Sequence, residues 1–120
     1  MKFDSNITRL ITALPSRIAT YNGRQLKEAI LKSEGRVIMG QNYVGNPIPY
    51  PGMISCELQF GFGADMVLIN GFNFENPTAE PGMQGMTLKE IKTLCANRPI
   101  GIYMSCPSEK DSALSDTQFI

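Results

Sequence analysis

The chain has 120 residues and a balanced formal charge, with 11 Lys and Arg against 11 Asp and Glu. This length suits one domain of ordinary size and excludes a complete fold of about 250 residues. A net charge of zero gives no overall attraction for nucleic acid or an anionic membrane, and no apolar run approaches the roughly 20 residues that span a bilayer. Because the N-terminus also lacks the apolar core of a secretion signal, we expect a soluble cytoplasmic protein that binds neither nucleic acid nor membranes.

The residue inventory excludes several classes of catalysis. The chain contains no histidine, so His-based triads, His-ligated metals and a histidine general base are impossible within it. Its three cysteines, Cys56, Cys95 and Cys106, are widely spaced and form no Cys-x-x-Cys pair. We expect three reduced, mostly buried thiols and no metal site built from them.

The first 35 residues carry two helical patterns. Apolar residues recur at spacings of three and four near the N-terminus, which predicts a short helix that Pro15 interrupts or restarts. A second helix is expected over residues 22–33. Asn22 is its candidate N-cap, Gln25 stands at the third helical position, and Gly35 follows its end.

Three apolar runs rich in β-branched residues predict strands near 36–42, 65–70 and 99–104. Because the runs are nearly continuous, we expect strands that are buried on both faces, as in a parallel sheet. A loop rich in Pro and Gly, residues 45–52, follows the first strand, and a longer loop, residues 72–86, follows the second.

Two further helices are expected between the strands, near residues 55–61 and 87–96. Ser55 is the candidate N-cap of the first of these helices. Thr87 and Glu90 form the Thr-x-x-Glu pattern of a capping box at the start of the second.

This alternation of helices and strands predicts an α/β fold, a parallel βαβαβ unit with three sequential strands. We assign the unit to residues 1–107. The remaining residues, 108–120, are rich in Ser, Asp and Lys and are expected to form a polar C-terminal tail.

Polar side chains follow each predicted strand. The carboxyl ends of parallel strands meet at one edge of a sheet, where α/β folds commonly bind ligands. Amides and hydroxyls at that edge suit the oxygens of a small carboxylate or phosphate ligand. The candidate ligand-binding residues are Gln41, Asn42, Asn70, Asn73 and Ser105. Amides at strand ends also cap turns, and this alternative stays open.

Three acidic residues have expected positions around this edge. Asp65 stands at the start of the second predicted strand and should lie at the opposite end of the sheet. Glu75 and Glu80 belong to the long loop after the second strand. Their carboxylates are either solvated surface groups or groups that approach the site and bind a divalent cation.

Three segments carry a resemblance to a known superfamily. Residues 54–72 combine a serine-started helix, Gly63-Ala64-Asp65 and an apolar strand that ends at Asn70-Gly71. This segment resembles the phosphoenolpyruvate mutase and isocitrate lyase superfamily. Together with residues 33–39 and 98–101, it more closely resembles an uncharacterised bacterial family labelled phosphoenolpyruvate phosphonomutase-like.

The resemblance covers about residues 16–107 and implies a (β/α)8 TIM barrel, of which this chain would supply the first three βα units. It also implies isomerase- or lyase-type chemistry on a small phosphorylated or carboxylate metabolite. In the superfamily, acidic residues near strand ends hold Mg²⁺. The matching strand ends of this chain carry Asn70 and Ser105 instead.

Two other functions stay open at this point. One is a truncated barrel without catalytic activity of its own, which associates through open sheet edges as a homo-oligomer or with a complementing chain. The other is a small α/β interaction module whose sheet edges are covered by its own terminal segments.

Overall fold

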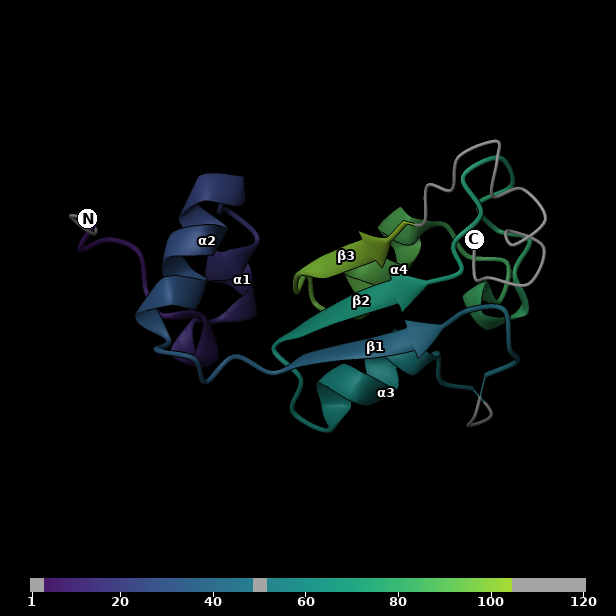
Figure 1. The fold of residues 1–120 in the computed structure, drawn as a ribbon, viewed down its shortest axis with the longest axis horizontal. Coiled ribbons are helices and arrows are strands. Elements are labelled where there is room, and N and C mark those ends of the chain that lie inside the picture. The colour runs from purple at the N-terminus through teal and green to yellow at the C-terminus, as the bar shows by residue number, and fades with distance from the viewer. Residues whose placement is uncertain (1–3, 49–51, 105–120) are drawn as a thin grey trace, which may run out of the picture.

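The computed structural model describes residues 4–48 and 52–104. Helices and strands alternate along the chain, after a short helical region at the N-terminus (Figure 1). The elements are the 3₁₀ helix η1 (Leu10–Thr12), α1 (Pro15–Ile18), α2 (Gly23–Lys32), β1 (Met39–Tyr43), α3 (Ser55–Gly61), β2 (Met66–Asn70), the 3₁₀ helix η2 (Pro81–Met83), α4 (Leu88–Leu94) and β3 (Ile100–Tyr103).

The strands form one open parallel sheet in the order β1-β2-β3. The α/β prediction of a parallel βαβαβ unit with three sequential strands is therefore confirmed. The register places Tyr43 beside Asn70, and Asn70 beside Tyr103. The last residues of the three strands thus lie next to one another.

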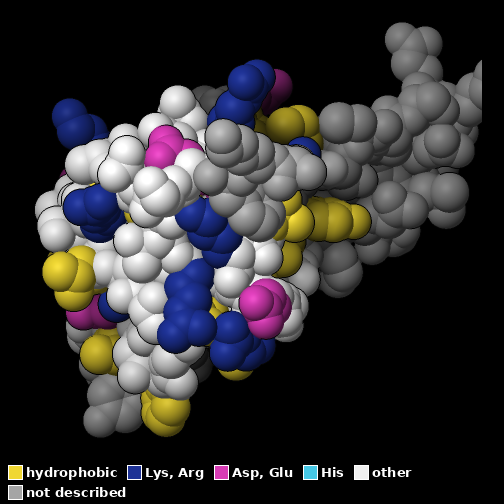
Figure 2. All heavy atoms as spheres, turned by 90° about the vertical axis from the view of Figure 1, so that its left-hand side faces the viewer, with side chains coloured by type: hydrophobic (Ala, Val, Ile, Leu, Met, Phe, Trp, Pro, Cys, Tyr) yellow, Lys and Arg dark blue, Asp and Glu magenta, His cyan; other side chains and the backbone are white. Residues whose placement is uncertain are grey.

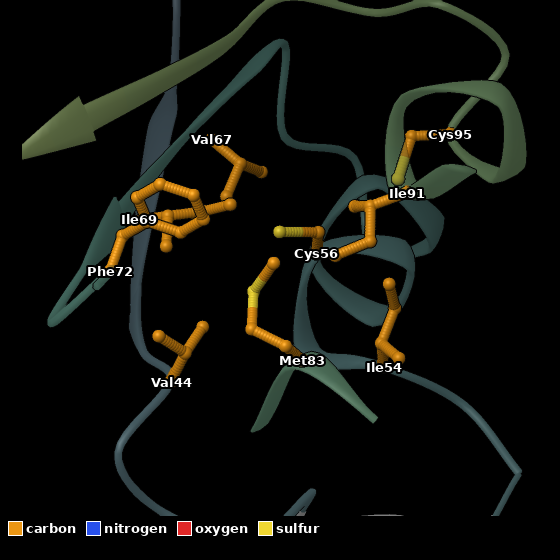
Figure 3. Close-up of a cluster of buried hydrophobic side chains, with 9 residues drawn as sticks. All are labelled: Val44, Ile54, Cys56, Val67, Ile69, Phe72, Met83, Ile91 and Cys95. Carbon is orange, nitrogen blue, oxygen red and sulfur yellow. The ribbon is translucent and has the colours of Figure 1, made fainter. Parts of the chain in front are cut away.

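Helices α3 and α4 cover one face of the sheet. Val67 and Ile69 of β2 point to this face and are fully buried. Their neighbours in the apolar core include Cys56 of α3, Ile91 of α4 and Met83 of η2 (Figure 3). Hydrophobic burial between these elements is the main stabilising contribution to this part of the fold.

The expectation of strands buried on both faces is wrong. Within the described residues, the opposite face of the sheet has no helix packed on it (Figure 1). On this face of β1, Met39 is 55% exposed and Tyr43 is 39% exposed. The cause is the number of strands: β1 and β3 are both sheet edges, and two crossover helices suffice to cover only one face.

The N-terminal helices form a second apolar cluster beyond the amino ends of the strands (Figure 1). Pro15 stands at the first position of α1, where its missing N–H is harmless, so the predicted restart at this proline is confirmed. Val37 and Met66 pack against the cluster and join it to the sheet. The buried residues of the cluster are Ile7, Leu10, Ile18 and Ala29.

Two of the three predicted helix caps are confirmed. Asn22 begins α2 with a complete capping box to Gln25, and Thr87 begins α4 with a complete capping box to Glu90. The prediction of Ser55 as an N-cap is wrong, because Ile54 holds that position and α3 has no side-chain cap. Ile54 is buried in the core, so packing fixes the start of this helix.

Helix α4 ends earlier than residue 96. Asn97 N–H donates to the Lys92 carbonyl and Ala96 N–H donates to the Thr93 carbonyl, the bond pair of a Schellman motif. Ala96 takes a left-handed conformation with φ of 56°. No helix in the described part of the chain is long and apolar enough to cross a membrane.

Candidate functional site

The carboxyl ends of β1, β2 and β3 point to the same end of the molecule, and the N-terminal helices lie at the other end (Figure 1). Tyr43, Asn70 and Tyr103 are adjacent at this end. Since Val67 and Ile69 point to the helices, the alternation of side chains along β2 places Asn70 on the uncovered face. We call these three residues the rim.

The amide of Asn70 is incompletely paired. Its side-chain Oδ1 is buried and accepts no hydrogen bond within the described part of the chain. Its backbone carbonyl accepts from the Val44 N–H at 2.9 Å, which extends the ladder one residue past β1. A buried acceptor without a donor is unfavourable by about 1–3 kcal/mol, so such groups often belong to binding sites.

Two glycines make room for the ring of Tyr43. A Cβ at Gly71 would lie 2.4 Å from Tyr43 Cε2, and one at Gly45 would lie 2.4 Å from Tyr43 Cζ. Gly71 also has a φ of 85°, which side chains rarely adopt. One edge of the ring therefore packs against Gly71, directly after Asn70, where the backbone takes a left-handed conformation.

Gln41 and Asn42 reach opposite faces of the sheet. Gln41 is exposed on the uncovered face, like Tyr43 two residues later. Asn42 points to α3, where its Oδ1 accepts from the thiol of Cys56 at 3.4 Å. The two amides are thus at the same end of the sheet but are separated by its backbone.

Asn73 makes the contacts of a turn-capping residue. Its Oδ1 accepts from the N–H groups of Glu75 at 2.9 Å and Asn76 at 3.1 Å. This oxygen is therefore committed to the turn, as the capping alternative expects. Ser105 lies outside the described residues.

The acidic residues are placed as follows. Asp65 lies at the amino end of β2, where its Oδ2 accepts from the Ile38 N–H at 2.9 Å, so its predicted position opposite the rim is confirmed. Glu75 is exposed and Glu80 is half-buried in the loop before α4. Neither carboxylate has an ion pair within the described residues.

Cys56 and Cys95 are poor nucleophiles in the folded chain. Cys56 and Cys95 are free and buried, which confirms the expectation for these two, and Cys106 lies outside the described residues. Burial raises the pKa of Cys56 from 9.0 to about 12, and the neighbouring Cys95 adds to this effect. Burial and the Glu57 carboxylate raise the pKa of Cys95 to about 11. At neutral pH both side chains are protonated thiols without access to a substrate.

The described residues do not fit a resident Mg²⁺ ion. Over residues 4–48 and 52–104, no three His, Cys, Asp or Glu side chains come close enough to hold a metal ion. The metal site that the resemblance implies therefore has no ligand set here. We derive no chemistry from such a metal.

Positive charge is distributed unevenly along the chain. Residues 37–88 contain no Lys or Arg but include Glu57, Asp65, Glu75 and Glu80. Figure 2 views the molecule from the N-terminal side and shows Lys and Arg side chains spread over that end. The loop that follows β2 at the rim thus carries two carboxylates, Glu75 and Glu80, and no cation. A phosphate dianion would find no complementary charge in this loop.

Sequence reasoning from amide types alone missed the two rim tyrosines. Both residues are the last of their strands, so the available signal was the two-residue period of each strand. Counting forward from the buried Val67 and Ile69 assigns Asn70 to the uncovered face, and strand pairing then adds Tyr43 and Tyr103. The same alternation along β1 places Gln41 on the uncovered face and Asn42 on the face that α3 covers.

A protein-family model matches residues 11–120 of this chain. The chain belongs to the family described as Domain of unknown function (DUF7916). No curated protein and no solved structure matches this DUF7916 chain. Its function therefore has to be argued from its own site.

Proposed function

We propose that this DUF7916 chain binds a small carboxylate metabolite at the rim, on the uncovered face of the sheet. The observation that carries the proposal is the Asn70 amide at the carboxyl end of the central strand, because its buried Oδ1 lacks a hydrogen-bond donor within the described residues and so marks a polar site that a bound molecule would complete. Parallel α/β sheets bind their ligands at this end. The amides of Asn70 and Gln41 and the hydroxyl of Tyr103 supply donors that a carboxylate accepts.

Of the two ligand classes expected from the sequence, the carboxylate is favoured over the phosphate. Residues 37–88 lack the Lys or Arg that usually neutralise a phosphate. The proposed role is binding without catalysis by the isolated chain, because the described residues offer no histidine and only buried thiols with raised pKa values. The barrel relationship, the metabolic reaction and the cytoplasmic location remain predictions.

Calorimetric titration tests this proposal. Three-carbon carboxylates with and without a phosphate group are titrated into the chain, with and without Mg²⁺. We expect carboxylate binding that does not need Mg²⁺ and that weakens about tenfold or more in Asn70→Ala, because a hydrogen bond to a charged group contributes about 1.5–3 kcal/mol. Asn42→Ala serves as the control on the helix-covered face. Equal losses in the two variants, or tighter binding of the phosphorylated acids, would contradict the proposal.

The uncovered sheet face favours a second candidate, an assembly role. Met39 is 55% exposed and Tyr103 is 50% exposed, and both strands that carry them are open edges. Apolar sheet surface of this kind is commonly buried by another chain. We expect concentration-dependent dimers in sedimentation velocity, which Met39→Lys reduces. A monomer at every concentration would remove this candidate and leave ligand binding unaffected.

A further inference from the structure

Two buried side-chain oxygens lack a hydrogen-bond donor within the described residues, Gln59 Oε1 and Asn70 Oδ1. They differ in their surroundings. Gln59 belongs to α3 on the covered face, where its Oε1 packs so tightly on Gly40 that a Cβ there would be 2.5 Å away. Its Nε2 already donates to the Gln41 carbonyl at 2.9 Å. Gln59 is thus a packing residue, whereas Asn70 lies on the face that no described helix covers.

An amide oxygen can only accept hydrogen bonds, so the missing partner of Asn70 Oδ1 has to be a donor. A carboxylate or a keto oxygen cannot fill this role. A hydroxyl group and an ammonium group both can. The ligand class is therefore narrower than small carboxylates in general, because one of its groups must donate a hydrogen.

Charge decides between the two donors. Residues 37–88 contain no Lys or Arg, and two of their four carboxylates, Glu75 and Glu80, belong to the loop that follows β2 at the rim. Of the flanking cations, Arg36 and Arg98 precede β1 and β3 at the amino end of the sheet, and Lys89 belongs to α4 on the covered face. A site in such surroundings favours a positively charged donor over a neutral one, because opposite charges attract over several ångströms.

We propose that the rim takes a carboxylate that carries an ammonium group on the neighbouring carbon, an amino-acid-like zwitterion. The ammonium donates to Asn70 Oδ1, and the carboxylate accepts from the Gln41 amide and the Tyr103 hydroxyl. This inference rests on the proposed function and adds the substrate class to it. It also explains how an anionic group can bind in a region without Lys or Arg, since the ligand brings its own positive charge.

The direct test compares three ligands with one carbon skeleton: alanine, lactate and pyruvate. They carry an ammonium, a hydroxyl and a keto oxygen at the same carbon. In calorimetric titrations of the full chain at pH 7, we expect alanine to bind at least about tenfold more tightly than pyruvate, because a site built for a donor rejects an analogue without it. Lactate should fall between them.

The outcomes separate the two proposals. If none of the three compounds binds, the proposed carboxylate site itself is wrong. Equal or tighter binding of pyruvate would overturn the zwitterion inference and leave the carboxylate site standing. Lactate binding as tightly as alanine would overturn the requirement for an ammonium group.

A matched pair of variants assigns the preference to Asn70. Asn70→Leu keeps a similar volume and removes the acceptor, so the ratio of alanine to pyruvate affinity should fall to about one. Asn76→Leu changes an exposed amide of the following loop and should keep the wild-type ratio. A preference that survives Asn70→Leu contradicts the assignment. Circular dichroism checks the fold of each variant. If Asn70→Leu is unfolded, the titrations of the wild-type chain with alanine, lactate and pyruvate decide the ligand class.

Discussion

Tyr43 and Gly71 are adapted to each other at the end of the sheet. The aromatic ring occupies the space that any side chain at position 71 would need, because a Cβ there would lie 2.4 Å from the ring. Gly71 also holds a φ of 85°, where residues with a Cβ are strained. Two separate penalties therefore oppose substitution at this glycine, a steric one from the ring and a conformational one from the backbone.

Gly71→Ala should lower the free energy of unfolding by about 2–3 kcal/mol, the sum of backbone strain and overpacking. In a Tyr43→Ala background the ring is absent, so the same substitution should cost only about 1 kcal/mol. Urea unfolding of the four proteins in this double-mutant cycle measures both values. Equal costs in the two backgrounds would show that the ring does not constrain position 71.

At the scale of single elements, local hydrogen bonds set the ends of α2 and α4. Each helix begins with a reciprocal capping box, and α4 ends with a Schellman motif. The residue in the left-handed position of that motif is Ala96, with φ of 56°. Glycine is the usual residue there, because a Cβ makes the left-handed region unfavourable.

Ala96→Gly should therefore stabilise the chain, by about 0.5–1 kcal/mol. The control is Ala19→Gly, since Ala19 has the ordinary helical φ of −59° and gains nothing from added freedom. The Ala19→Gly substitution should leave the free energy of unfolding unchanged or lower it. Thermal unfolding ranks the three proteins. A lower midpoint for Ala96→Gly than for wild type would contradict the strain argument.

Thr87→Ala should destabilise the chain by about 1 kcal/mol through α4. Thr87 Oγ1 accepts from the Glu90 N–H at 3.2 Å, and the Glu90 side chain accepts from the Thr87 N–H at 3.3 Å. Loss of a cap of this kind typically costs about that much. Because the Thr87 hydroxyl also donates to Glu90 Oε1 at 3.1 Å, Glu90→Ala should cost less in Thr87→Ala than in the wild type, although the backbone N–H of residue 87 keeps its own bond to Glu90. Denaturant unfolding of both single variants and the double variant measures the coupling, and strictly additive losses would argue against a working capping box.

These elements show what the sequence could predict and what it could not. The capping boxes at Asn22 and Thr87 depend on residues three positions apart, so they were predictable. The start of α3, which relies on the burial of Ile54, was not, because packing rather than a local pattern fixes it. The uncovered sheet face was also missed, since an apolar run such as 37–39 has the same appearance in an edge strand and in a central strand.

At the scale of the whole molecule, two apolar clusters among residues 4–48 and 52–104 stabilise the chain. One lies between the N-terminal helices, and the other lies between the sheet and the helices α3 and α4. The sheet cluster contains both described thiols, Cys56 and Cys95 (Figure 3). Unfolding exposes these thiols to water, where they ionise far more readily. The stability of the molecule is therefore linked to pH through its core.

The sign of this linkage follows from the raised pKa values. The pKa of Cys56 is raised from 9.0 to about 12 and that of Cys95 from 9.0 to about 11 in the folded chain. Below pH 9 both states keep the protons, so the full stability is present. Above pH 9 only the unfolded state loses them, and the free energy of unfolding falls until the pH reaches the folded values.

We expect this loss to reach about 1 kcal/mol per thiol at pH 10, relative to pH 8, because one unit of pKa difference corresponds to about 1.4 kcal/mol. The Cys56→Ala, Cys95→Ala double variant isolates the effect, since every other titratable group is present in both proteins. Its unfolding free energy should decrease less between pH 8 and pH 10 than that of the wild type, by about 2 kcal/mol, in urea titrations at each pH. Parallel pH curves for the two proteins would mean that these thiols already ionise in the folded chain, and that the core around them admits water.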